Sequence, residues 1–318
     1  MSRIGGNTAQ AKRYIWQHPS WPSLRFNQTE TAPKVVLARR QQGILLGQVK
    51  AIGLQQLQKV IHDVWIEDAV ATAAIEGEKL DLNSVRSSVL RRLGLASGQR
   101  RAVDRRVDGL IEVMEDATTG YQTPLTADRL CRWQSALFPG GTSGIQRIEV
   151  GRFRTHSDPM QIVGGPLGKE TVYYTAPPAS RVPTEMRRFL KWFEDTRPDK
   201  RGPVDGIVRA AMAHLWFETV HPFEDGNGRI GRAIVDLALA QDSEGPIRFY
   251  SMSHQVMRER KAYYNALGNT QRGGVDVTGW VVWFLDQFIE SCLHSTALIE
   301  AAIAKSKFWS LRADRPLN

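Results

Sequence analysis

Residues 221–232 read His-Pro-Phe-Glu-Asp-Gly-Asn-Gly-Arg-Ile-Gly-Arg. Apolar residues precede it from Val208 to Val220 and follow it from Ile230 to Ala240. This pattern predicts a loop that leads into the N-terminus of a helix. Gly226 and Gly228 allow a ligand to approach the backbone closely. The unpaired N–H groups at a helix N-terminus favour an anion such as phosphate.

The charged side chains of the stretch fit the transfer of a phosphate-containing group. Arg229 and Arg232 are three residues apart, so they share one helix face and can both reach one anion. Asp225 supplies a hard oxygen ligand, which suits Mg²⁺ when the metal also binds phosphates. His221 is the side chain here that can accept a proton near neutral pH. These parts together predict phosphoryl or nucleotidyl transfer.

The stretch resembles the Fic family motif, His-x-Phe-x-Asp/Glu-Gly-Asn-Gly-Arg-x-x-Arg, at every fixed position. The resemblance implies transfer of a nucleoside monophosphate, usually AMP from ATP, onto a protein hydroxyl. It implies that His221 deprotonates this hydroxyl, that Phe223 anchors the loop in the core and that Asp225 holds Mg²⁺. Phosphate binding falls to Gly226, Asn227, Gly228, Arg229 and Arg232, the last at the γ-phosphate. The alternative is a salt-bridged surface loop whose histidine and arginines only cap a helix.

An upstream segment, Thr72-Ala73-Ala74-Ile75-Glu76-Gly77, resembles the inhibitory motif Ser/Thr-x-x-x-Glu-Gly/Asn of Fic proteins. Thr72 and Glu76 are four residues apart and share a helix face. The resemblance implies that Glu76 pairs with Arg232, withholds the arginine from the γ-phosphate and keeps the enzyme inhibited. A helix end closed by Gly77 explains the same residues without any regulation.

Two β-prone runs, Gln161–Val163 and Thr171–Thr175, flank the glycine-rich residues 164–168 and predict a hairpin. Fic proteins carry such a hairpin as a flap that binds the target by strand addition. The resemblance assigns target binding here to Gln161, Ile162, Val163, Tyr173 and Tyr174. A ribbon without functional importance is the alternative. Tyr264 resembles a family aromatic near the nucleoside, although a tyrosine on a helix can equally serve the core or the surface.

Helical periodicity covers most of the remaining chain. It predicts helices near 34–52, 54–75, 84–93, 104–117, 126–138, 183–195, 204–220, 230–240 and 255–267, and one helix or a broken pair of helices at 277–306. We therefore predict a mainly α fold in four segments. An N-terminal arm (1–33) precedes a helical N-terminal region (34–95) that contains the inhibitory helix. A Fic-type helical core with one β-hairpin flap (96–305) and a C-terminal tail (306–318) follow. Within the core, Gly151-Arg152-Phe153-Arg154 resembles a segment ahead of the active site in Fic domains.

The composition is that of a globular protein, with 42% hydrophobic and 24% charged residues in 318. No apolar run is long enough to span a bilayer, and Met1 to Gln17 lack the apolar core of a secretory signal. The two cysteines, Cys131 and Cys292, argue against a disulfide framework and against a cysteine metal site. These features fit a cytoplasmic protein without a membrane partner.

The net charge of +9 raises the question of nucleic-acid binding. The basic residues are densest at Arg91, Arg92, Arg100, Arg101, Arg105 and Arg106. Asp104 and Asp108 interrupt this stretch, and a solvated helical face is the commoner explanation. We therefore expect no nucleic-acid partner.

Adenylyl transfer from Mg·ATP to a Ser, Thr or Tyr hydroxyl of a target protein is the expected function, and a homodimer stays open. Other functions also stay open. The motif binds phosphates rather than the base, so UMP, phosphocholine or phosphate are alternative cargoes. Removal of AMP is another alternative, since Glu76 beside the phosphates can orient a water. A DNA-binding or scaffolding regulator, switched by nucleotide, is an alternative from a different class.

Overall fold

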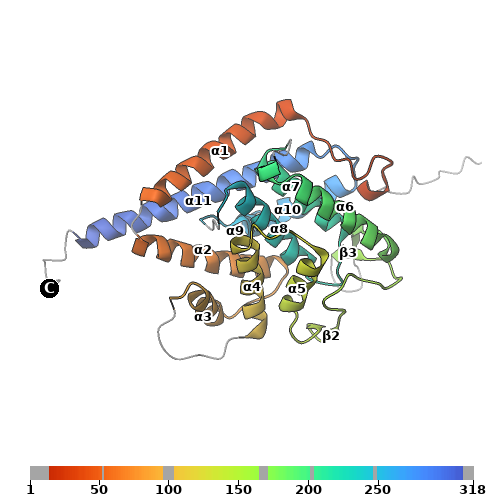
Figure 1. Cartoon of the computed structure of the whole chain (residues 1–318), viewed down its shortest axis with the longest axis horizontal. Coiled ribbons are helices and arrows are strands. Elements are labelled where there is room, and N and C mark those ends of the chain that lie inside the picture. The colour runs from red at the N-terminus through yellow and green to blue at the C-terminus, as the bar shows by residue number, and fades with distance from the viewer. Residues whose placement is uncertain are drawn as a thin grey trace, which may run out of the picture.

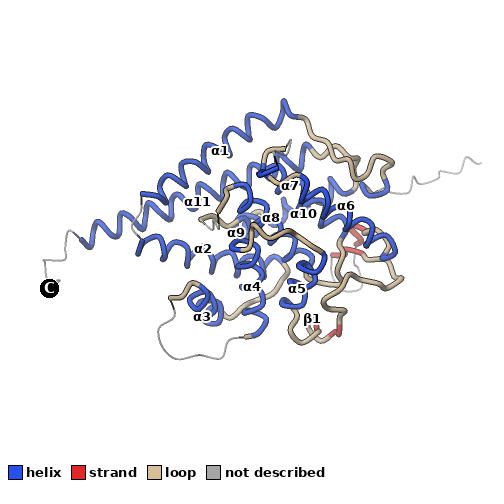
Figure 2. Tube along the Cα trace, in the orientation of Figure 1, coloured by secondary structure: helices blue, strands red, loops and turns tan. Residues whose placement is uncertain are grey.

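The computed structural model describes residues 14–51, 54–95, 104–164, 171–200, 204–245 and 249–310. Helices dominate these residues (Figures 1 and 2), which confirms the predicted mainly α fold. The α-helices are α1 (Gln28–Ala51), α2 (Leu54–Ile75), α3 (Leu82–Arg92), α4 (Arg105–Thr119), α5 (Ala127–Leu137), α6 (Val182–Asp195), α7 (Gly206–Val220), α8 (Asn227–Asp242), α9 (Met252–Arg258), α10 (Arg260–Gln271) and α11 (Thr278–Ser310).

Two antiparallel strand pairs accompany the helices in the described residues. The predicted hairpin is present as β3 (Gln161–Gly164) and β4 (Thr171–Thr175). A second pair, β1 (Thr142–Ser143) with β2 (Gln146–Arg147), was not predicted because each strand has only two residues. Strands of that length leave no periodicity to read in the sequence.

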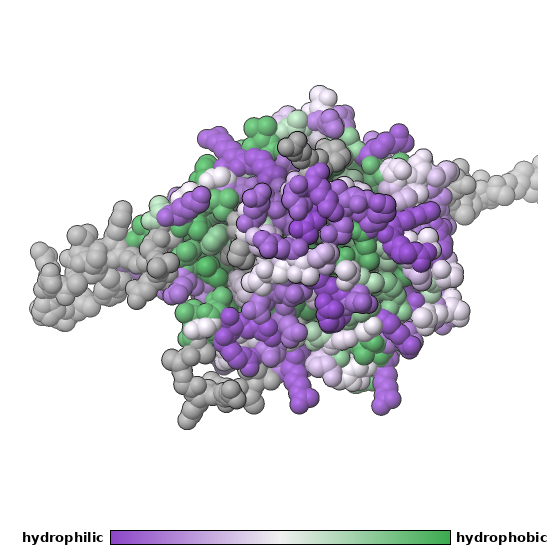
Figure 3. All heavy atoms as spheres, in the orientation of Figure 1, coloured by the Kyte–Doolittle hydropathy of each residue, from purple (hydrophilic) through white to green (hydrophobic). Residues whose placement is uncertain are grey.

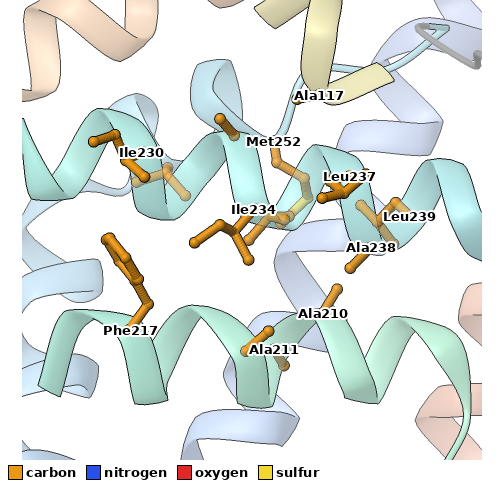
Figure 4. Close-up of a cluster of buried hydrophobic side chains, with 14 of the residues drawn as sticks. Ala117, Ala210, Ala211, Phe217, Ile230, Ile234, Leu237, Ala238, Leu239 and Met252 are labelled. Atoms are coloured by element: carbon orange, nitrogen blue, oxygen red, sulfur yellow. The ribbon is translucent and has the colours of Figure 1, made fainter. Parts of the chain in front are cut away.

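The core is centred on α7 and α8, the two helices that flank the motif. Every residue of α7 is buried, including the polar side chains of Arg209, His214 and Glu218. Figure 4 shows Phe217, Ala210 and Ala211 of α7 facing Ile234 and Ala238 of α8. The small alanine side chains let the two helices approach closely. The motif between them is therefore held by the most buried part of the molecule.

Residues 14–27 lie along the body and contact the predicted flap. The rings of Tyr14 and Tyr174 pack edge to face with centroids 5.1 Å apart. Trp16 Nε1 donates to the carbonyl of Thr175 at 2.8 Å. Beyond this arm, α1 and α11 run side by side along one edge of the molecule (Figure 1). The arm thus braces β4 from the N-terminal side of the chain.

Several helix boundaries differ from the predictions. α1 begins at Gln28 rather than near residue 34, because Asn27 Oδ1 accepts from the N–H groups of Thr29 and Glu30 at 3.0 and 3.3 Å and caps the helix. The helix expected at 255–267 is divided into α9 and α10, which meet at Glu259. α11 is one continuous helix that extends to Ser310.

The outer face seen in Figure 3 is mostly hydrophilic, with smaller apolar areas. None of the described helices is both long enough and apolar enough to cross a membrane. In the arginine-rich stretch, Arg91 pairs with Asp108 at 2.5 Å and Arg92 with Glu115 at 2.5 Å. Arg100 and Arg101 lie outside the described residues.

Candidate active site

His221 occupies the turn between α7 and the motif loop, in a left-handed conformation with φ 49° and ψ 62°. Its N–H donates to the carbonyl of Phe217 at 2.9 Å, and its carbonyl accepts from Arg154 Nε at 2.8 Å. Arg154 Nη2 also donates to the carbonyl of Pro177 at 2.5 Å. Arg154 therefore fixes the turn that presents the histidine. Arg154 belongs to the Gly-Arg-Phe-Arg segment. The resemblance of that segment to Fic domains indicated that it lies ahead of the active site, but it did not predict the contact with His221.

The imidazole of His221 is neutral at neutral pH. Burial, followed by the positive charge of Arg154, lowers the pKa of His221 to about 4. Glu218 Oε2 lies 3.6 Å from His221 Nδ1. Burial, followed by the charge of Glu76, raises the pKa of Glu218 to about 8. Glu218 is therefore largely protonated at neutral pH and does not hold a proton on His221, which leaves the ring ready to accept one.

Phe223 and Asn227 fix the motif loop to the core. Phe223 is fully buried, with ring centroids 5.3 Å from Phe153 and 6.5 Å from Phe217. Asn227 Oδ1 accepts from the N–H of Phe223 at 2.9 Å, and its Nδ2 donates to the carbonyl of Phe223 at 2.8 Å. Both ends of this side-chain amide are thus engaged by the loop. A phosphate contact at Asn227 would come from its backbone N–H or from the second N–H of its side-chain amide.

A carboxylate of the chain itself approaches the start of α8, which is the candidate anion site. Gly226, at φ +87°, turns the chain into α8, and the first N–H groups of a helix have no acceptor within it. A Cβ built at Gly228 would lie 2.2 Å from Glu76 Oε1. Glu76 therefore lies directly against the backbone where a phosphate would bind.

Arg232, the second motif arginine, is held by the end of α2. Its Nη2 donates to Glu76 Oε1 at 2.8 Å and to the carbonyl of Thr72 at 2.9 Å. Its Nε donates to Thr72 Oγ1 at 2.7 Å. Burial alone would raise the pKa of Glu76, but the charge and hydrogen bond of Arg232 outweigh it and lower the pKa, so Glu76 is ionised. Thr72 and Glu76 thus form one two-point clamp on a single guanidinium.

Arg229, the first motif arginine, is engaged by a second acid of the same segment. Its Nη1 lies 3.1 Å from Glu78 Oε1, and its guanidinium carbon lies 4.8 Å from the centroid of the Phe138 ring. Glu78 was not among the predicted site residues. Its place two residues after Glu76 was the available signal, but the family pattern stops at Gly77.

Asp225 lies at the mouth of the site. Its Oδ1 accepts from the N–H of Gly226 at 2.5 Å, and its Oδ2 accepts from the hydroxyl of Ser143 in β1. The side chain is 39% exposed. A single accessible carboxylate beside a phosphate site suits Mg²⁺, which keeps most of its ligands as water and substrate oxygens. The contact with Ser143 was not predicted because β1 and β2 were not.

Tyr264 lies next to the inhibitory segment. Its hydroxyl donates to the carbonyl of Ile75, the last residue of α2, at 3.3 Å. The guanidinium carbon of Arg260 lies 5.6 Å from its ring centroid. The adjacent Tyr263 is buried, and its hydroxyl is 3.0 Å from His214 Nε2. Of the two tyrosines, Tyr264 is thus the one that can reach a ligand beside Glu76.

The two flap tyrosines have opposite surroundings. Gln161 pairs with Thr175 and Ile162 with Tyr174, and a bulge precedes the pair Val163 and Val172. Tyr173 is 48% exposed, whereas Tyr174 is buried and donates its hydroxyl to the carbonyl of Thr219 at 2.7 Å. Tyr174 therefore anchors the flap to α7, and its side chain does not offer the target contact that was expected of it. The hairpin residues 165–170 lie outside the described part of the chain.

Comparisons with known proteins divide the chain into two stretches. Residues 14–95 match a domain of unknown function, DUF4172, and residues 124–239 match the Fic/DOC family. A probable protein adenylyltransferase of Aquifex aeolicus is 28% identical over 104 residues, which cover 33% of this chain and 28% of that protein. The protein adenylyltransferase Fic of Drosophila ananassae is 28% identical over 144 residues, which cover 44% of this chain and 25% of that protein. The chain thus spans about a quarter of the length of these relatives.

Solved structures of Fic proteins have a similar fold. A Fic family protein from Desulfovibrio desulfuricans superposes with a TM-score of 0.61 at 24% identity, over 83% of this chain and 74% of that one. A Fic domain containing signaling protein from Bacteroides thetaiotaomicron reaches 0.61 at 17% identity, over 84% and 97%. The match over residues 124–239, with the intact motif between α7 and α8, shows that this stretch is a Fic/DOC family domain, and the chain as a whole has the fold of solved Fic proteins.

Proposed function

We propose that the protein transfers AMP from ATP to a Ser, Thr or Tyr hydroxyl of a target protein. The observation that carries this proposal is the position of a neutral, half-buried His221 at the turn between α7 and the motif loop that leads into α8. The same helix start bears Arg229 and Arg232. A proton acceptor beside an anion site is the pair of functions that attack on a phosphate requires. The relatives named as protein adenylyltransferases support AMP as the transferred group.

In this mechanism the target hydroxyl attacks the α-phosphorus of ATP, and its proton passes to His221. The new bond joins the hydroxyl oxygen to phosphorus. The bond from the α-phosphorus to the bridging oxygen breaks, and pyrophosphate leaves. The backbone N–H groups at the start of α8, together with Arg229 and Arg232, stabilise the charge that develops on the phosphate oxygens. Asp225 would hold Mg²⁺, which neutralises phosphate charge when bound.

We infer further that the conformation described is the inhibited one. Glu76 lies at the start of α8 and pairs with Arg232, and Glu78 pairs with Arg229. Two carboxylates therefore occupy the positive groups that the triphosphate needs. Like charges in this confined space repel, so ATP and the segment 76–78 compete for one site. Productive binding would require Glu76 to leave Arg232.

The flap is proposed as the surface that binds the target. Strand addition needs an accessible hairpin near the chemistry, and β3 with β4 is such a hairpin. Tyr174 ties it to Thr219, two residues before His221. Tyr173 is the exposed aromatic that a target segment can contact. The substitution Tyr173→Gly should therefore raise the Michaelis constant for the target more than that for ATP.

The transfer itself is tested with ATP labelled in the α-phosphate. Wild type, Glu76→Gly and the double variant His221→Ala/Glu76→Gly are incubated with Mg²⁺ and a lysate that supplies targets. We expect protein-bound label with Glu76→Gly, less with wild type and none with the double variant. Label from γ-labelled ATP would instead indicate phosphate transfer, and label only from α-labelled UTP would indicate uridylyl transfer. Loss of label from a preloaded target that depends on Glu76 would favour AMP removal.

A further inference from the structure

Three metal-ligating side chains from three helices meet away from the candidate active site. They are Glu67 of α2, His254 of α9 and His294 of α11, and one ligand atom of each lies within 4.8 Å of the others. Glu67 Oε2 is 3.3 Å from His294 Nε2. The rings of His254 and His294 stack with centroids 4.6 Å apart. All three residues are half-buried, so the cluster is open to solvent on one side.

A buried network independent of these side chains holds their backbones in place. Asp68, next to Glu67, accepts from the hydroxyl of Ser251 at 2.6 Å and from the N–H of Ser253 at 3.3 Å. The same hydroxyl accepts from the N–H of His254 at 2.9 Å. The start of α9 is thereby pinned to α2. His254 therefore remains beside Glu67 whether or not an ion is bound.

The ligand set and its spacing indicate which ion would fit. Two imidazoles and one carboxylate are a set that zinc sites use, with the fourth position left to water or another ligand. With metal–ligand distances of about 2.1 Å, tetrahedral ligand atoms lie about 3.4 Å apart. The distance of 3.3 Å between Glu67 and His294 is close to that value. Since the three ligand atoms lie within 4.8 Å of one another, metal binding requires the half-buried His254 ring to rotate toward the other two ligands. Hard cations such as Mg²⁺ and Ca²⁺ prefer oxygen ligands and do not suit the pair of imidazoles.

We propose that Glu67, His254 and His294 bind a divalent transition metal with the preferences of Zn²⁺, and that the ion fastens α2 to α9 and α11. These three helices pack against one another. Glu67 precedes Glu76 by nine residues, or roughly 13 Å along α2 at 1.5 Å per residue. The ion would therefore hold the helix whose end contacts Arg232. This regulatory consequence rests on the proposed function, whereas metal binding does not.

Metal binding is tested on the whole chain after treatment with a chelator. Zn²⁺ is titrated by calorimetry into wild type, Glu67→Gln, His254→Ala and His294→Ala. The matched control is His62→Ala, which removes another histidine of α2. Wild type and His62→Ala should each bind one equivalent of Zn²⁺. Each of the three ligand variants should bind Zn²⁺ at least about tenfold more weakly. The Co²⁺ form of wild type should show the visible absorption of a tetrahedral site, and Mg²⁺ should bind to none of these three side chains.

A second readout follows α2 directly. Zn²⁺ should slow amide hydrogen exchange in α2 of wild type and of His62→Ala, but not of His294→Ala. Circular dichroism without metal shows whether each variant is folded. If a ligand variant is unfolded, His294→Gln is used in its place. Equal uptake and equal affinity in wild type and the ligand variants would overturn the proposal, as would unchanged exchange in α2. Neither readout uses AMP transfer, so a negative result here is separate from a negative transfer assay.

Discussion

Glu76 and Gly228 share one small space at the start of α8. A Cβ at residue 228 would come 2.2 Å from Glu76 Oε1, so only glycine lets the carboxylate approach. The same close approach is what a phosphate requires of the backbone. A nucleotide phosphate bound at this backbone would therefore compete with the chain's own carboxylate. The proposed inhibition is direct competition and needs no long-range conformational signal.

Competition predicts a gain in nucleotide affinity when Glu76 is removed. Glu76→Gly should bind a non-hydrolysable ATP analogue with Mg²⁺ at least about tenfold more tightly than wild type, which corresponds to about 1.4 kcal/mol. Calorimetry measures the dissociation constants. Glu76→Gln keeps the size of the side chain but removes its charge, and it should fall between the two. Equal affinities in all three proteins would contradict the competition.

The pairing of Glu78 with Arg229 should contribute less than that of Glu76. The Glu78 side chain is 42% exposed, and ion pairs of exposed groups contribute about 0–1 kcal/mol. Glu78→Gln should therefore raise the transfer rate by less than about fivefold. The control is Glu112→Gln, which removes an exposed carboxylate that pairs with Arg92 rather than with a motif arginine. A rise as large as that of Glu76→Gly would show that Arg229, not Arg232, limits the reaction.

Thr72 should matter for stability as well as for regulation. Thr72→Val removes the hydroxyl that accepts from the buried Arg232 Nε. A buried charged donor without its acceptor costs about 1–3 kcal/mol, so the free energy of unfolding should fall by that amount. Thr72→Ser keeps the hydroxyl and should recover most of the loss. Urea unfolding compares the three proteins, and a valine variant as stable as wild type would refute the contribution.

The raised pKa of Glu218 predicts that the free energy of unfolding falls as the pH rises. Its pKa is raised from 4.5 to about 8 in the folded protein. Within that window the unfolded chain releases the proton and the folded chain retains it, so Glu218 makes stability fall as pH rises. Glu218→Gln removes this effect. Between about pH 5 and about pH 7 the variant should gain roughly 2–3 kcal/mol on wild type in denaturant unfolding.

The depressed pKa of His221 works in the other direction and serves as an internal comparison. Its folded pKa of about 4 lies below the ordinary 6.5, so the unfolded chain binds the proton first as pH falls. Stability that depends on His221 is thus lost on acidification between these two values. Both Glu218→Gln and wild type should show this loss of stability at acidic pH. If the two stability curves stay parallel across the neutral range, Glu218 is not protonated there.

The candidate site could be predicted from the sequence to the extent that it is local. The base, the turn and the start of α8 all come from residues 221–232, and that stretch folds within itself around Phe223. The clamp by Thr72 on Arg232 joins residues 160 positions apart. No local pattern reveals which acceptors meet a given guanidinium. The family resemblance pointed to Glu76, but the double role of Thr72 and the contact of Glu78 needed the packing of α2 on α8.

The flap and the helix boundaries show where local rules were sufficient and where they failed. Alternation along a strand already implies that Tyr173 and Tyr174 face opposite sides, so the burial of one of them was predictable. Asn27 is a standard cap, but α1 also contains Pro33, and proline inside a helix runs against helix propensity. The division at Glu259 has no such signal, because residues 255–267 contain neither proline nor glycine. There the packing of α9 between α2 and α11 overrides helix propensity.

The contact between Glu76 and Arg232 also joins two stretches of the chain that match different family models. Glu76 belongs to the stretch that matches a domain of unknown function, and Arg232 belongs to the Fic/DOC stretch. An exchange of either stretch during evolution would leave a carboxylate or a guanidinium without its partner. We expect selection to act on both stretches as one unit, so that positions 76 and 232 change together across descendants of this chain.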